Sequence, residues 1–313
     1  MHEEPLFEKL TLIGLGLIGS SIARAAKAHS AVRKLAALDS SPQVLARVRE
    51  LQIADDASGD VAGAVEDADL VILCAPVGAS GAIAREIAPH LRHGAIVSDV
   101  GSVKGSVVKE VAPLLPSGVH FVPAHPLAGT EYSGPDAGFA TLFKNRWCLL
   151  TPPNHAENDA VEALAEFWKR LGAKVEVTTP EHHDLALAIT SHLPHLIAFN
   201  IVGTADHLEK VTEQEVIKFS ASGFRDFTRI AASDPTMWRD VFLNNKAAVL
   251  EMLSRFNADL AALQKMIEED DGKGLFDLFT RTRAIRRGVI EQGQDTAAPD
   301  FGRPTARENE LKP

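Results

Sequence analysis

A glycine pattern placed between an apolar run and an amphipathic stretch constrains the fold of this chain more than any other feature. Gly14, Gly16 and Gly19 have the spacing GxGxxG, directly after the apolar residues 10–13 and at the start of helical periodicity over residues 18–29. The spacing alone is a weak signal, because glycines co-occur by chance. Between a strand and a helix, however, the first glycine permits a tight turn, the second lets a pyrophosphate approach the backbone, and the third lets the helix pack closely. The segment therefore predicts a dinucleotide-binding turn.

An acidic residue after the second expected strand indicates which dinucleotide binds. Asp39 lies 20 residues after Gly19, where a carboxylate accepts hydrogen bonds from the adenosine ribose and repels a 2′-phosphate. This favours NAD over NADP, although an aspartate that only serves the turn before Pro42 is an alternative. Ala75 and Pro76 follow a later strand at the same edge of the sheet. The predicted cofactor-binding residues are Gly14, Gly16, Leu17, Ile18, Gly19, Asp39, Ala75 and Pro76.

Residues 1 to about 179 alternate short apolar runs with helix-like stretches such as 18–29 and 103–115. Strands that are apolar throughout and alternate with helices are typical of a parallel sheet covered on both faces. We therefore expect an α/β fold with a Rossmann-type doubly wound parallel sheet. The expected strands are 10–13, 35–38, 70–75, 95–97, 121–124, 147–150 and 174–177.

From Thr179 onwards the pattern becomes helical. Thr179-Pro180 and Asp234-Pro235 each have a capping residue followed by proline at the first helical position, and the second pair precedes a long helix expected to run towards Glu269. We expect an all-α substrate-binding and dimerisation domain, because its apolar faces exceed what a small bundle buries alone. Those faces include Ala247, Val249, Leu250, Leu253, Leu260 and Leu263. The predicted divisions are 1–179 for the NAD-binding domain, 180–290 for the helical domain and 291–313 for a disordered tail.

The charge and composition limit the class of protein. A formal net charge of −10 argues against a binder of duplex DNA, which would carry a basic face. Cys74 and Cys148 lie in apolar runs and are expected to be buried, reduced thiols. The acidic N-terminus lacks the pattern of a secretory signal, and we expect no apolar run of membrane-spanning length. The expectation is a soluble, cytoplasmic protein with a small-molecule substrate, without nucleic-acid or membrane partners.

Three groups of polar residues remain after the dinucleotide site is explained. Ser102 lies between an expected strand and helix, where its hydroxyl either caps the helix or faces the nicotinamide end of the crevice. His125 is expected between a strand end and a loop held by Pro126, a position poorly explained by packing. Ser191 and His195 share one helical face, next to a proline that should kink the helix. No acidic or cysteine ligand lies at metal spacing nearby, so we expect no metal.

Five motifs together resemble the prephenate/arogenate (cyclohexadienyl) dehydrogenases of tyrosine biosynthesis. The resemblance extends over roughly residues 8–288, and unrelated dehydrogenases share the first motif but not the last three. The motifs are GLGLIGSS at 14–21, DVGSVKG at 99–105, HPLAGTE at 125–131, SHLPH at 191–195 and GFRDFTRIAASDPTMWRD at 223–240.

The resemblance implies an oxidative decarboxylation of a cyclohexadiene, in which the C4 hydride passes to NAD⁺, the C1 carboxylate leaves as CO₂ and the ring becomes aromatic. His125 would accept the proton of the C4 hydroxyl, and Ser102 would orient both groups. Arg229 would bind the ring carboxylate, for which a guanidinium is geometrically suited. Arg225 shares its helical face, and one of the two could simply pair with Asp226 or Asp240, but the motif match favours Arg229. The remaining implied substrate contacts are His195, Ser191, His192, Thr130 and Glu131.

Two other readings stay open at the level of sequence. A β-hydroxyacid dehydrogenase pairs a similar front half with a helical back half, but Lys218 and Lys246 have no supporting motif for the lysine such enzymes use. A catalytically silent NAD-sensing protein would have no reason to keep the polar residues of the last motifs together. The sequence does not separate prephenate from arogenate as the substrate.

Overall fold

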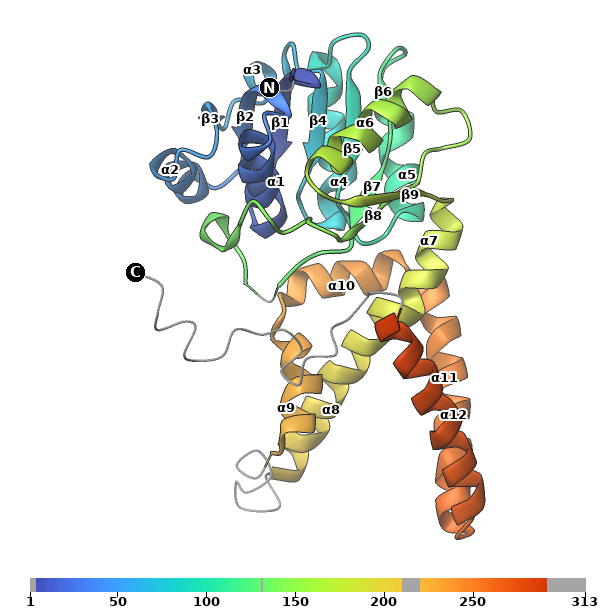
Figure 1. The fold of residues 1–313 in the computed structure, drawn as a ribbon. Coiled ribbons are helices and arrows are strands. Elements are labelled where there is room, and N and C mark those ends of the chain that lie inside the picture. Colours follow the sequence, from blue (N-terminus) through green and yellow to red (C-terminus); the bar gives the residue numbers. More distant parts are fainter. Residues whose placement is uncertain (1–3, 131, 210–219, 292–313) are drawn as a thin grey trace. The chain divides into compact units, whose positions relative to one another are not determined.

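A six-stranded parallel sheet forms the front of the chain in the computed structural model, which describes residues 4–130, 132–209 and 220–291 (Figure 1). The strands are β1 (Phe7–Ile13), β2 (Val32–Leu38), β3 (Asp56–Ser58), β4 (Leu70–Leu73), β5 (Ile96–Asp99) and β6 (His120–Phe121). Their order is β3-β2-β1-β4-β5-β6, so the direction of winding reverses between β1 and β4. Ligands of such sheets bind in the crevice at the carboxyl ends of the strands on either side of this reversal.

Helices cover both faces of this sheet, as the apolar strands predicted. Successive residues of β4 belong to two different clusters of buried side chains: Leu70 and Ile72 to one, Val71 and Leu73 to the other. The doubly wound α/β fold expected from the sequence is therefore confirmed. The helices between the strands are α1 (Leu17–Ala28), α2 (Pro42–Glu50), α3 (Val61–Val65), α4 (Ser80–Ile87) and α5 (Gly105–Val111).

One expected strand, 121–124, is in fact two strands in different sheets. β6 stops at Phe121, and β7 (Ala124–Pro126) pairs with β8 (Trp147–Leu150), which in turn pairs with β9 (Lys174–Val177). Pro123 lies between them and has no N–H to continue the ladder, so the chain leaves the large sheet there. The helix α6 (Asn158–Arg170) joins β8 to β9. Strand β3, which is short and polar, was not predicted.

The back of the chain is helical, and both predicted caps are confirmed. Thr179 Oγ1 accepts a hydrogen bond from His182 N (3.2 Å), and Asp234 Oδ1 accepts one from Met237 N (2.8 Å). The single long helix expected towards Glu269 is wrong, because the helix is broken at Asn245. The elements are α7 (Pro180–Leu187), a π-helical turn (Ala188–His192), α8 (Leu193–Glu209), α9 (Ser222–Thr228), a 3₁₀ turn (Arg229–Ala232), α10 (Pro235–Asn244), α11 (Lys246–Glu268) and α12 (Gly272–Glu291).

The chain divides into two compact units, Met1–Met252 and Leu253–Pro313. The first contains both sheets and the helices up to α10 with the start of α11. The second contains the rest of α11 and α12. The domain boundary near residue 179 stays a prediction from the sequence. The predicted tail lies, beyond Glu291 itself, outside the described residues.

One helical segment corrects the expectation that no run reaches membrane-spanning length. Residues Pro180–Leu208 form 29 helical residues with a mean hydropathy of 1.6 over their best 18-residue window, 28% of which is buried. The segment is long and apolar enough to cross a membrane by these two criteria, because His, Thr and Pro interrupt its apolar runs without adding charge. A core helix of a soluble protein passes the same test, so this segment is weak support for a membrane span.

Candidate active site

The glycine turn after β1 has the geometry that a bound dinucleotide requires. Gly14 has φ +96°, and a Cβ there would lie 3.0 Å from the carbonyl atoms of Cys74. A Cβ on Gly19 would lie 2.1 Å from Gly14 O, so these two glycines are required by the protein's own packing. A Cβ on Gly16 would meet nothing within 4 Å, and Gly16 provides no side-chain cap for α1. Open space in front of uncapped N–H groups fits a pyrophosphate.

The carboxylate of Asp39 is held at the same edge by two backbone groups. Leu15 N donates to Oδ2 and Ser41 N to Oδ1, both at 2.9 Å. Each oxygen keeps a lone pair with which to accept a ribose hydroxyl. Leu17 and Ile18 belong to the first turn of α1 and are half-buried, while Ala75 and Pro76 lie two and three residues after the end of β4. These residues fit the NAD cofactor that the sequence predicts.

His125 lies within β7 and not in a loop, which corrects the expected placement. Its side chain is 8% exposed, and its Nδ1 is 2.8 Å from Nε2 of His183 in α7. Burial lowers the pKa of His125 well below 6.5, and the neighbouring His183, Lys104 and His192 lower it further. The imidazole is therefore neutral at pH 7, the form that can accept a proton.

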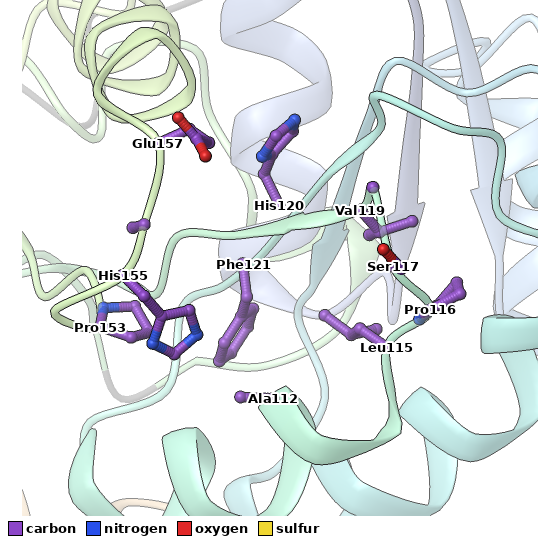
Figure 2. A pocket seen from close by; sticks show the side chains of 12 residues that line it. Ala112, Leu115, Pro116, Ser117, Val119, His120, Phe121, Pro153, His155 and Glu157 are labelled. Carbon is purple, nitrogen blue, oxygen red and sulfur yellow. The ribbon is translucent and has the colours of Figure 1, made fainter.

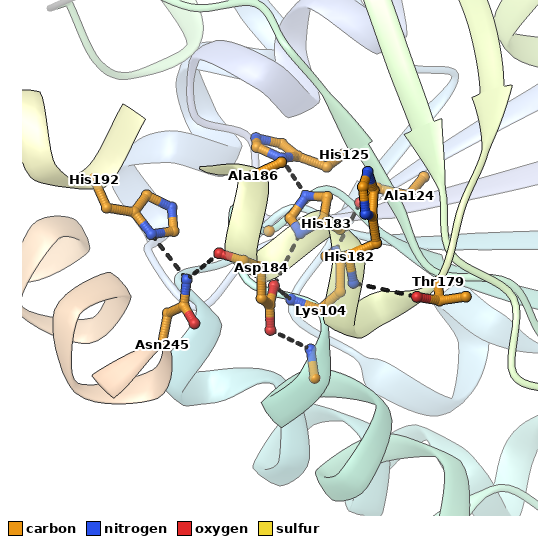
Figure 3. A network of polar contacts seen from close by, with 12 residues as sticks. Lys104, Ala124, His125, Thr179, His182, His183, Asp184, Ala186, His192 and Asn245 are labelled. Atoms are coloured by element: carbon orange, nitrogen blue, oxygen red, sulfur yellow. Dashed lines mark hydrogen bonds and ion pairs between the residues drawn. The ribbon is translucent and has the colours of Figure 1, made fainter. Parts of the chain in front are cut away.

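Asp184 of α7 joins this histidine pair to the start of α5 (Figure 3). Its Oδ1 lies 2.9 Å from His183 Nδ1, and its two oxygens accept hydrogen bonds from Lys104 N and Gly105 N, each at 2.8 Å. Asp184 thus caps α5 from another element. The alternative that Ser102 caps this helix is wrong, because no side chain of the loop itself does so. Ser102 is half-buried two residues before Lys104, and its hydroxyl bonds to none of the described residues.

A buried ion pair fixes the β5–α5 loop beneath this network. The side chain of Lys104 is fully buried and donates from Nζ to Asp99 Oδ2 and to Ala124 O, the latter at 2.7 Å. Gly101 N also donates to Asp99 Oδ2, at 2.8 Å. These bonds link β5, the start of α5 and β7, the strand that carries His125. They keep the loop bearing Ser102 in a fixed position relative to that strand.

His192 is held on the far side of Asp184. It is fully buried at the end of the π-helical turn, with its Nδ1 3.1 Å from Asn245 Nδ2. Asn245, at the break between α10 and α11, also donates from Nδ2 to the backbone oxygen of Asp184 (2.8 Å). Burial lowers the pKa of His192 to about 4, although Asp184 opposes that shift. Its Nε2 has no hydrogen-bond partner in the described part of the chain, and the Ser102 backbone faces its ring.

His195 follows the irregular turn that Pro194 requires. Its Nδ1 donates to Ser191 O (2.9 Å), and its ring stacks on Trp238 with centroids 3.7 Å apart. Pro194 has no N–H for the preceding turn, so the predicted disturbance of this helix is present as a π-helical turn rather than a simple bend. Burial lowers the pKa of His195, and the charge of Arg229 acts in the same direction.

The remaining predicted residues lie on more exposed elements. Both candidate arginines are exposed: Arg229 begins the 3₁₀ turn after α9 and is close enough to His195 to affect its pKa, and Arg225 lies within α9. Asp240, offered as a partner for Arg225, is bonded by Arg239 (2.8 Å). Thr130 is exposed, and its Oγ1 accepts from Tyr132 N (3.3 Å). Glu131 lies outside the described residues.

The sequence analysis missed His183, Asp184 and Asn245. A signal was present for Asp184, which is seven residues before Ser191 and would share its face in a regular helix. Asn245 gave no local signal. Within the described ranges, no group of three or more His, Cys, Asp or Glu side chains could hold a metal.

A separate cavity of about 290 Å³ lies at the amino end of β6, opposite the edge that would hold a dinucleotide (Figure 2). His120 and Phe121 line it together with His155 and Glu157 from the segment before α6. It contains none of the residues predicted to act on substrate or cofactor.

A doubly wound sheet with a glycine turn, an acidic residue after β2 and a buried neutral histidine defines the class of dinucleotide-dependent dehydrogenases. Two family models match the chain: the nucleotide-binding domain of prephenate dehydrogenase over residues 22–177 and the dimerization domain of prephenate dehydrogenase over residues 179–281. The chain belongs to the prephenate dehydrogenase family, and is an NAD-dependent dehydrogenase of that family.

Individual relatives agree with the family models. A cyclohexadienyl dehydrogenase of Zymomonas mobilis is 43% identical over 281 residues, which are 90% of this chain and 96% of the relative. A prephenate dehydrogenase of Bacillus subtilis is 34% identical over 94% of this chain and 79% of its own length. The crystal structure of prephenate dehydrogenase from Aquifex aeolicus in complex with hydroxyphenyl propionate and NAD⁺ has a TM-score of 0.85 at 31% identity, covering 90% of this chain and 98% of that one.

Proposed function

We propose that this chain oxidatively decarboxylates prephenate, arogenate or both with NAD⁺, in tyrosine biosynthesis. The products are 4-hydroxyphenylpyruvate from prephenate and tyrosine from arogenate. The observation that carries this proposal is a buried, neutral His125 in the same compact unit as a turn suited to NAD. Family membership and the likeness to an NAD⁺-bound relative support it.

The residues of this chain would handle the proton and the charges of the reaction. When bound at the glycine turn and Asp39, NAD⁺ supplies the hydride acceptor. His125 Nε2 takes the proton of the C4 hydroxyl as that carbon loses hydride, and Ser102 orients the hydroxyl. The C1–carboxylate bond then breaks, its electrons move through the ring to the C4 oxygen, and His125 returns the proton to that oxygen. The ring leaves as a phenol, with CO₂ and NADH as the other products.

The other predicted residues would bind the substrate. Arg229 is the proposed partner of the ring carboxylate, since a guanidinium binds a carboxylate through two parallel hydrogen bonds. His195 donates from Nδ1 to Ser191 O, so its neutral ring presents Nε2 as an acceptor towards a ligand. The remaining proposed contacts are Ser191, His192, Thr130 and Glu131.

The assembly and cellular location are proposals as well. The match of residues 179–281 to a dimerization domain supports a homodimer formed through the helical region. A cytoplasmic enzyme without nucleic-acid or membrane partners is consistent with the charge and with the relatives. The alternative of a β-hydroxyacid dehydrogenase is not favoured, because the family match extends through both halves of the chain.

The test is NADH formation by the purified chain with prephenate, arogenate and 3-hydroxyisobutyrate. We expect turnover with prephenate or arogenate and none with 3-hydroxyisobutyrate, and the ratio of kcat/KM for the first two gives the preferred substrate. Turnover of 3-hydroxyisobutyrate alone would overturn the proposal.

The same assay tests the cofactor assignment. The unmodified enzyme should prefer NAD⁺ over NADP⁺ by about tenfold or more, and Asp39→Ser should lose most of this preference because the repulsion of the 2′-phosphate disappears. Asp56→Ser, an exposed change on β3, is the matched control. Equal use of NADP⁺ by the unmodified enzyme would contradict the role of Asp39.

A further inference from the structure

Three side chains form a continuous line of contacts from the substrate histidine to a carboxylate (Figure 3). His125 Nδ1 is 2.8 Å from His183 Nε2, and His183 Nδ1 is 2.9 Å from Asp184 Oδ1. His125 belongs to β7 and the other two residues to α7, so the contact between the two histidines depends on how these two elements pack. His183 is fully buried, and Asp184 is half-buried. A buried polar chain of this kind requires a defined direction for each hydrogen bond.

Asp184 sets that direction, because it can only accept. Its oxygens already receive the N–H groups of Lys104 and Gly105, which favours the ionised form. Burial raises the pKa of Asp184, but the hydrogen bonds from His183, Lys104 and Gly105 outweigh it and leave the pKa below its usual value. His183 must therefore donate from Nδ1, which leaves Nε2 of its neutral ring as an acceptor. His125 in turn must donate from Nδ1, which leaves its own Nε2 unprotonated.

We propose that His183 and Asp184 are positioning residues, which hold His125 in the Nδ1–H tautomer and stabilise the positive charge it gains during the reaction. This inference rests on the proposed function, in which Nε2 of His125 takes the hydroxyl proton. The proton goes no further than His125, which later returns it to the C4 oxygen, and no proton moves on to His183 or Asp184. The same logic of a carboxylate acting through an imidazole underlies other histidine bases, where the carboxylate fixes the tautomer and does not itself become protonated.

The charges around His125 show why such help is needed. Facing it are the ammonium group of Lys104, the ring of His192 and the thiol of Cys148 on the paired strand β8. The Asp99 carboxylate is already paired with Lys104. A positively charged His125 would therefore be buried and close to the Lys104 ammonium group. None of the groups just named is a carboxylate that pairs with it. Asp184, acting through His183, is the anion placed to offset that cost.

A purely structural role would give the same contacts, so the test must separate the two. Asp184 also caps α5, and replacing it would disturb the helix whatever its role in catalysis. His183 is the better position. A glutamine there presents an oxygen near the place of Nε2 and can accept from His125 Nδ1, whereas a leucine of similar bulk cannot. His182→Leu, an exposed change at the neighbouring position in α7, is the control.

Steady-state kinetics against pH are the first measurement. We expect His183→Leu to lower kcat by about 10- to 100-fold, as loss of an orienting partner typically does, with the KM for substrate and the affinity for NAD⁺ changed by less than about threefold. Its acidic limb should move to lower pH, because an imidazolium without its acceptor is less stable. His183→Gln should recover most of the kcat. Equal losses in the leucine and glutamine variants with an unchanged acidic limb would overturn the proposal.

Nitrogen NMR of ¹⁵N-histidine-labelled enzyme without substrate is the second measurement, with the His125 signals assigned by their loss in His125→Asn. We expect the Nδ1–H tautomer in the unmodified enzyme and in His183→Gln, and a mixture of tautomers in His183→Leu. An Nε2–H tautomer in the unmodified enzyme would refute the inference, even if no variant can be purified. This readout is independent of the substrate, so absence of turnover with prephenate and arogenate would count against the proposed function alone.

Discussion

At the scale of single residues, burial decides what His125 can do. An exposed histidine is partly protonated at neutral pH, whereas burial and nearby cations keep His125 neutral. The same burial makes it a weaker base, because its cationic form is unfavourable in a dry environment. The reaction therefore depends on how well the surroundings stabilise that cation in the transition state. The rate therefore depends on the groups that contact His125 as much as on the imidazole itself.

The pH dependence of kcat/KM follows from this shift. A base must be unprotonated to act, so activity should be constant above pH 6.5 and fall as the pH drops through the pKa of His125, which lies well below 6.5. His125→Asn keeps a polar side chain but removes the base, and we expect kcat to fall by about 10²–10⁴ and the acidic limb to flatten.

The control for this variant is His182→Asn, which changes an exposed histidine of α7 and should leave the profile intact. His192, with a pKa of about 4, and His195, whose pKa is also lowered, titrate in the same acidic range. NAD⁺ affinity should stay the same in His125→Asn. Near-normal kcat with an unchanged acidic limb would assign the base to another group, with His195 the next candidate.

At the scale of elements, the helices that contribute to the candidate site depart from regular α-helical geometry at two places. The π-helical turn Ala188–His192 and the break at Asn245 both lie where a polar side chain bonds across elements. Pro194 made the first irregularity predictable, because it lacks an N–H. The break at Asn245 was not predictable, since the helical periodicity continues through it and the Asn245 side chain bonds there to Asp184, 61 residues earlier. Local rules thus predicted caps and strands, but not partners from distant segments.

The turn from α9 into the 3₁₀ segment offers two arginines for the substrate carboxylate. Arg229→Ala should raise the KM for substrate about 10- to 150-fold and lower kcat less, because the carboxylate contact is present before the transition state as well as in it. Arg229 is preferred because its charge acts on His195 and lowers the pKa of that ring. Arg225→Ala is the matched control, one helical turn earlier. A raised KM in Arg225→Ala with a normal KM in Arg229→Ala would reverse the assignment.

At the scale of the whole molecule, the sheet topology explains why the sequence could propose cofactor residues at one edge of the sheet. Gly14 and Asp39 follow a strand directly and Pro76 comes three residues after the end of β4, and parallel strands bring their carboxyl ends to one edge. The positions of most predicted substrate residues were harder to infer, because these residues come from the second sheet and from the helices. The periodicity of apolar residues does not determine how those elements pack on one another. The sequence singled out His125 as poorly explained by packing, and its strand and its partner His183 emerged only from the structure.

The last prediction concerns the oligomer. Large apolar side chains are exposed on α11 and α12, including Leu260 (52%), Phe276 (69%) and Phe279 (56%), and residues 179–281 match a dimerization domain. We expect a dimer by light scattering at micromolar concentration. Leu260→Glu should raise the dimer dissociation constant about tenfold or more, because a two-fold interface would bury the charge twice. Leu260→Met, which keeps the apolar surface, should leave the dimer intact. A monomer in the unmodified protein would contradict the prediction.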